Sequence, residues 1–83
     1  MKLRIIAKNN RGFFAGYNEE FGHVVISLDG MTPIELNDVL SSETWDDSDG
    51  LFKYVMNLTS GDEVKICIEN WSLSKNQALR WLS

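Results

Sequence analysis

The sequence predicts a mostly β fold, a small antiparallel barrel of five strands with two short helices. Apolar and polar side chains alternate in several short runs, at the period of a strand with one buried face. Turns rich in Gly, Asn and Asp separate these runs. At 83 residues, 43% of them hydrophobic, the chain is long enough for one core and too short for two. We therefore expect residues 1–83 to form a single domain.

The first third of the chain predicts a meander of three strands. Apolar residues alternate with basic ones over residues 2–8, and a turn-prone segment, 9–12, follows. We expect a second strand over residues 13–17. The run 23–28 is rich in β-branched residues, which fit a pleated surface, and predicts the third strand.

A hairpin is expected in the second half of the chain. Branched apolar residues alternate with polar ones over residues 63–69, and the segment 59–62 has turn composition. Residues 51–58 carry apolar side chains at alternate positions, but their apolar residues also share one helical face. We favour a strand because Gly-containing turns bound a run of strand length. A helix there would instead give an α+β fold with a four-stranded antiparallel sheet.

Two capping patterns predict short helices. A Thr-Pro pair followed by Glu35 is typical of a helix start, so we expect a short helix near residues 33–40. Ser74 and Gln77 form a second capping-box pattern, which predicts a C-terminal helix over residues 74–82. The segment from Gln77 onward also fits a last strand that closes the barrel.

In this order, the elements resemble a cold-shock domain or another small barrel of the oligonucleotide-binding (OB) or SH3-like type. Residues 11–14 (RGFF) are similar to the start of that family's first nucleic-acid motif, and residues 24–26 fall where its second motif lies. Residues 58–66 resemble its Leu-x-x-Gly-x-x-Val-x-aromatic turn and strand, and 77–78 (QA) lies near its closing Gln-Ala. The resemblance implies the fold first, and single-stranded nucleic-acid binding second.

The sequence departs from this family at the positions that would contact nucleic acid. Val25, Ile26 and Ser27 replace the aromatic and His stacking residues of the second motif. Ile5 and Ile6 stand where the family has an aromatic first strand. The resemblance therefore supports the fold more strongly than the activity.

Charge is distributed unevenly along the chain, whose net charge is −4. Nine carboxylates lie between residues 12 and 52, where there is no Lys or Arg. Our main interpretation is a non-enzymatic module that binds a protein partner through this acidic segment, as a phage-type inhibitor or a nucleic-acid mimic would. The candidate binding residues are Glu43, Trp45, Asp46, Asp47 and Asp49.

The alternative interpretation is single-stranded nucleic-acid binding through a cold-shock-like basic and aromatic face. Basic side chains follow phosphates, and aromatic rings stack on bases. The residues of this face would be Lys2, Arg4, Lys8, Arg11, Phe13 and Phe14.

The sequence offers no catalytic or metal-binding constellation. His23 is the only histidine, and Cys67 is expected to be a modestly exposed thiol without a base beside it. The acidic run 46–50 fails the EF-hand spacing, because Trp45 and Met56 would occupy the first and twelfth positions. We expect neither enzymatic activity nor a cofactor or metal.

The single cysteine and the lack of a long apolar run also bear on location and assembly. One cysteine cannot form an internal disulfide, which favours a reducing, cytoplasmic setting. No run approaches the roughly 20 apolar residues of a membrane-spanning helix, so no membrane partner is expected. An open barrel would leave an edge strand at which two copies could pair as a homo-oligomer.

Overall fold

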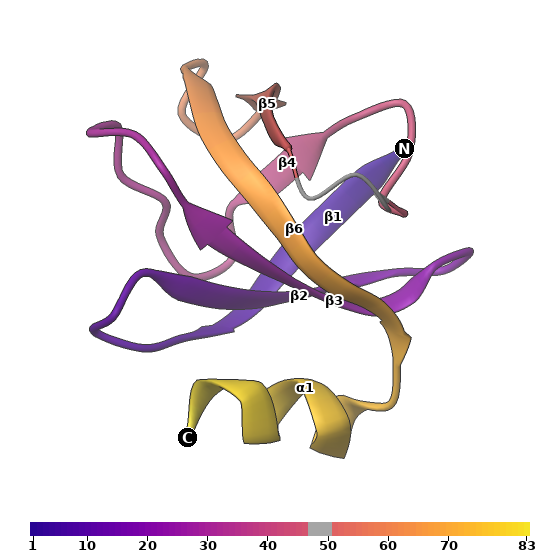
Figure 1. Cartoon of the computed structure of the whole chain (residues 1–83). Coiled ribbons are helices and arrows are strands. Elements are labelled where there is room, and N and C mark those ends of the chain that lie inside the picture. Colours follow the sequence, from indigo (N-terminus) through magenta and orange to yellow (C-terminus); the bar gives the residue numbers. More distant parts are fainter. Residues whose placement is uncertain (47–50) are drawn as a thin grey trace.

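The computed structural model describes residues 1–46 and 51–83 (Figure 1). Its elements are β1 (Lys2–Lys8), β2 (Phe13–Asn18), β3 (Gly22–Leu28), β4 (Val39–Ser41), β5 (Phe52–Asn57), β6 (Glu63–Leu73) and α1 (Lys75–Leu82). The strands close into an antiparallel barrel in the order β1-β2-β3-β6-β5-β4, because β4 pairs with both β5 and β1. The predicted mostly β barrel is confirmed, with six strands in place of five.

The meander and the hairpin form where the sequence predicts them. β1, β2 and β3 pair in sequence order, and β5 pairs with β6 from Phe52↔Cys67 to Met56↔Glu63. Residues 51–58 therefore contain a strand, and the α+β alternative does not apply. The predicted C-terminal helix is also confirmed, and its capping box forms through Ser74 and Gln77.

The predicted helix near residues 33–40 is wrong. Asn37 adopts a left-handed backbone conformation with φ 70°, and the Asp38 carboxylate accepts a hydrogen bond from Glu35 N. These contacts make a tight turn that leads directly into β4. Ile34 and Leu40, on either side of the turn, are both buried in the core. Residues with a helix-capping pattern therefore form a turn. The chain must reverse here to bury both Ile34 and Leu40.

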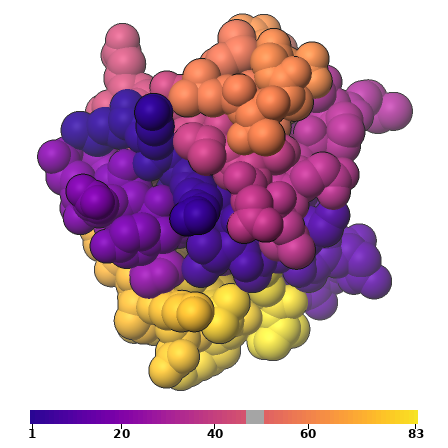
Figure 2. Space-filling view, turned by 180° about the vertical axis from the view of Figure 1, so that it is seen from behind, coloured from indigo at the N-terminus to yellow at the C-terminus, as the bar shows by residue number. Residues whose placement is uncertain are grey.

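The core fills the interior of the barrel, and α1 packs on its outside. Branched aliphatic residues from the strands, with Phe14, Ile34 and Trp45, make the main buried cluster. α1 covers the outer face of β2 and β3, where Ala78 packs against Ala15 and Val25. These small side chains let the helix approach closely, and Figure 2 shows it, in yellow, along one end of the molecule.

A buried polar network holds the turn before β4 against the β5–β6 hairpin. The Asn57 side chain is fully buried, and its Nδ2 donates to Asp38 Oδ2 at 2.8 Å. Its Oδ1 accepts from the backbone N of Thr59 and Ser60, which shapes the turn after β5. Each polar atom of this amide thus has a partner, as a buried amide requires.

Replacing Asn57 with Ala should destabilise the protein by about 2–3 kcal/mol, because it leaves the Asp38 carboxylate and two turn amides with fewer partners. Chemical denaturation measures this change. Asn70→Ala is the matched control. The half-buried Asn70 side chain accepts a local hydrogen bond from the adjacent Trp71 N, and its loss should cost below about 1 kcal/mol. Equal losses in the two variants would contradict a structural role for the network.

Candidate functional site

The outward side of β5 carries large apolar side chains. Phe52 is 56% exposed, Tyr54 63% and Met56 42%. We call these three residues the β5 outer face. The opposite side of the strand supplies Val55 to the core and Asn57 to the buried network. Side chains of β5 alternate between two sides, as the sequence predicts. The residues that face solvent are Phe52, Tyr54 and Met56, because Val55 and Asn57 occupy the inward positions.

Lys65 of β6 lies beside the two rings of the β5 outer face. Its Nζ is 4.9 Å from the ring centroid of Phe52 and 5.9 Å from that of Tyr54. Such cation–π contacts attract and help to orient the rings. The Lys65 Nζ also pairs with Asp29 Oδ2 at 3.2 Å, so its charge is largely compensated. Lys65, itself held by Asp29, therefore helps to fix the orientation of the Phe52 and Tyr54 rings.

β4 and β5 separate soon after they pair. Their pairing consists of Leu40↔Asn57 and Ser41↔Met56. The following segment turns toward the start of β1, where Ser42 and Met1 exchange backbone hydrogen bonds in both directions. Trp45 Nε1 also donates to Met1 O at 3.1 Å. A pocket of about 620 Å³ lies between residues 41–44 and 53–56.

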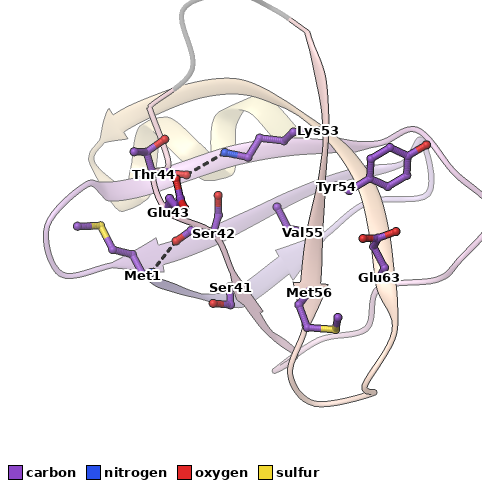
Figure 3. A pocket seen from close by; sticks show the side chains of 10 residues that line it. All are labelled: Met1, Ser41, Ser42, Glu43, Thr44, Lys53, Tyr54, Val55, Met56 and Glu63. Carbon is purple, nitrogen blue, oxygen red and sulfur yellow. Dashed lines mark hydrogen bonds between the residues drawn. The ribbon is translucent and has the colours of Figure 1, made fainter.

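Figure 3 shows the groups that line this pocket. Lys53 extends from β5 to the Thr44 carbonyl oxygen, 3.0 Å from its Nζ, whereas Tyr54 points to the other side of the strand. The same Nζ lies 5.7 Å from the Trp45 ring centroid. The exposed carboxylates of Glu43 and Glu63 belong to the pocket lining. The lining also holds the Lys53 ammonium and the Met1 amino group, so the pocket carries charges of both signs where it borders the β5 outer face.

The residues predicted for the acidic surface divide into three groups. Glu43 and Asp46 are exposed and available to a partner. Trp45 is fully buried, so its indole is a core residue and not an exposed anchor. Asp47 and Asp49 lie outside the described residues. Glu43 shares a pocket lining with Tyr54 and Met56, and so lies beside a feature that the sequence did not indicate, the apolar outer face of β5.

Four of the residues predicted for the basic and aromatic face are not brought together at an open surface. Phe14 lies in the core, and Phe13 is half-buried against the cluster under α1. Lys8 pairs with Glu35 at 3.0 Å, and the Arg11 guanidinium donates to the backbone oxygen of Ser83. Their side chains serve packing and local pairing.

Lys2 and Arg4 lie beside the ring of Tyr17, and not beside Phe13 and Phe14 as predicted. Tyr17 is the cross-strand partner of Arg4, and its ring centroid is 4.9 Å from that of His23, tilted by 52°. A hollow of about 500 Å³ is lined here by Arg4, Ile6, Tyr17, His23, Lys75 and Leu79. An adjoining hollow of about 760 Å³ includes Lys2. The sequence alone does not indicate this site, because strand pairing and the packing of α1 bring together residues that are far apart in sequence.

The structure places His23 against the Tyr17 ring and Cys67 inside the protein. Cys67 is buried beneath the sheet contacts of β3 and β5, so the expectation of a modestly exposed thiol is wrong. Within residues 1–46 and 51–83, no group of three or more His, Cys, Asp or Glu side chains is placed to hold a metal ion. No helix in the same residues is long and apolar enough to cross a membrane.

Comparison of the chain with protein-family models, with curated proteins and with solved structures found no match.

Proposed function

We propose that this protein is a non-enzymatic binding module that docks a protein partner through the β5 outer face and the carboxylates around it. The observation that carries the proposal is the presentation of Phe52, Tyr54 and Met56 to solvent on one strand. Aromatic residues and Met are enriched at the centres of protein interfaces, and neighbouring apolar exposure of this kind marks interaction sites.

The setting of these side chains favours binding. β5 is paired with β6 over its length, so the backbone beneath the rings is already ordered. Lys65 further orients the rings of Phe52 and Tyr54. Ordering a surface before it binds lowers the entropy lost on association, so more of the contact energy appears as affinity.

The charges around the β5 outer face indicate a partner with a basic surface. Glu43, Asp46 and Glu63 are exposed, and none of them forms an ion pair with another described residue. Of the two nearby lysines, Lys65 pairs with the Asp29 carboxylate, whereas Lys53 donates to the uncharged Thr44 carbonyl and keeps its positive charge. A basic partner would meet apolar anchors surrounded by carboxylates, which speeds and orients docking. A nucleic-acid-handling protein is such a partner, and the module would then act as its inhibitor.

A photo-crosslinking residue at position 56 should capture the partner, whose affinity for purified variants then tests the site. Phe52→Ala and Tyr54→Ala should each weaken binding at least about tenfold, because truncation of a central aromatic anchor commonly costs 2 kcal/mol or more. Calorimetry measures the affinity, and thermal unfolding checks that both variants fold.

Met31→Ala is the matched control, since Met31 is 99% exposed but lies outside the site. It should change the affinity less than about twofold. If Met31→Ala weakens binding as much as Tyr54→Ala does, the β5 outer face is not the docking site.

A second candidate function is single-stranded nucleic-acid binding at the hollow that contains Arg4, Tyr17 and His23. The closed barrel agrees in outline with the cold-shock or OB-like resemblance. The specific observation in its favour is the close pair of Tyr17 and His23 rings beside Arg4 and Lys75. Rings could stack on bases while the cations contact phosphates. The acidic β5 region weighs against this candidate, because carboxylates repel a phosphate backbone.

Fluorescence anisotropy of a labelled oligothymidylate tests this second candidate. Binding through Lys2, Arg4 and Lys75 should weaken with salt at a log–log slope of about −2, at about −0.7 for each phosphate contact. Tyr17→Ala should weaken it about tenfold through lost stacking. Lys8→Gln, which removes one charge outside the hollow, should leave the Tyr17-dependent stacking unchanged. No anisotropy change at low salt would eliminate this function.

A further inference from the structure

The backbone of β5 is only partly covered on the side that faces β4. Asn57 N donates toward the β6 side, to Asp62 O at 2.8 Å, and Leu58 N donates toward the β4 side, to Val39 O at 2.8 Å. Because backbone groups of successive strand residues point to opposite sides, those of Phe52, Tyr54 and Met56 all point toward β4.

Of these three residues, only Met56 has a strand partner on that side. Met56 pairs with Ser41, the last residue of β4. If β4 continued, Glu43 would stand opposite Tyr54, but residues 42–45 turn away to Met1 and the pocket takes their place. No strand in the described part of the chain pairs with Phe52 or Tyr54 on this side. Among residues 1–46 and 51–83, β5 thus has an open half-edge at residues 52–55 inside a closed barrel.

We propose that this half-edge binds an extended, basic peptide segment, which is added as a short strand beside β5 in the place that a longer β4 would fill. The inference rests on the proposed protein-binding function and specifies the form of the partner's contact. Unpaired strand edges bind peptides in this way, with main-chain hydrogen bonds for affinity and alternate side chains for specificity.

The chemistry of the pocket selects this occupant. The backbone N–H and C=O groups of Tyr54 require alternating acceptors and donors, which an extended peptide supplies. The exposed carboxylates of Glu43 and Glu63 line the pocket and favour Lys or Arg side chains. The Met1 ammonium in the same lining donates to the Ser42 carbonyl, and the added strand would displace Lys53. A second copy of this chain carries the same net charge of −4 and would be repelled, and so would a nucleic acid. Alternate side chains of the added strand would lie beside Tyr54 and extend the β5 outer face.

The Lys53 side chain extends across the pocket beside the half-edge. Its Nζ reaches the Thr44 carbonyl across the pocket, through a single exposed hydrogen bond (Figure 3). An added strand must displace this contact, and a basic strand is also repelled by the ammonium. Removing the Lys53 side chain should therefore strengthen peptide binding.

The test uses acetylated eight-residue peptides in which Lys alternates with Val or Tyr, titrated into the ¹⁵N-labelled full chain. Saturable shifts of the Phe52 and Tyr54 amide signals are expected. N-methylation of alternate peptide residues removes N–H groups from one edge of the peptide at a time. In one register it should weaken binding at least about tenfold, through loss of two or more hydrogen bonds, and in the other register about twofold or less.

Two variants of the protein complete the test. Lys53→Ala should tighten peptide binding severalfold, and Glu43→Gln should weaken it severalfold, both by changing the charge next to the bound strand. Neither residue is in the core, so both variants should fold normally.

Equal losses from N-methylation in both registers, or the absence of binding by every peptide, would overturn strand addition. The β5 outer face would then still be supported if Phe52→Ala and Tyr54→Ala weaken binding of the crosslinked partner. Failure of the proposed function has a different signature, since those two variants would bind the intact partner as tightly as the unaltered protein does.

Discussion

The attachment of residues 42–45 to the start of β1 is the constraint on which the rest of the structure depends. Ser42 exchanges backbone hydrogen bonds with Met1, and Trp45 donates to the same Met1 carbonyl while filling the core. Burial of an indole this large contributes several kcal/mol, far more than one further backbone pair with β5 would add. The chain therefore leaves β5 in order to bury Trp45.

Two surface features follow from the separation of residues 42–45 from β5. β4 remains three residues long, just enough to join β1 to β5 and close the barrel. In the part of the chain that the structure describes, the first part of β5 is then paired on one side, with β6, and borders a pocket on the other. Since Val55 and Asn57 point inward, Phe52 and Tyr54 stand in solvent beside the open half-edge. The burial of Trp45 thus leaves both an exposed apolar surface on β5 and backbone groups beside the pocket that a partner could bind.

The sequence predicts the barrel well because its strands are local patterns with clear turns, as in β1 to β3 and the β5–β6 hairpin. It predicts the site poorly. The phase of β5 depends on the distant Asp38, which makes the inward position of Asn57 favourable. The burial of Trp45 depends on Met1, and the meeting of Arg4, Tyr17 and Lys75 depends on strand pairing and helix docking. Each of these contacts joins residues far apart in the chain, so no local sequence pattern predicts it.

Amide hydrogen exchange in the free protein measures the open half-edge most directly. We expect the Tyr54 amide, which faces the pocket, to exchange almost as fast as an unprotected amide. The Val55 amide, bonded to β6, should exchange about 100-fold more slowly or slower still, since strand hydrogen bonds must open first. Protection of Tyr54 equal to that of Val55 would mean that β5 is covered on both sides, and would contradict the account.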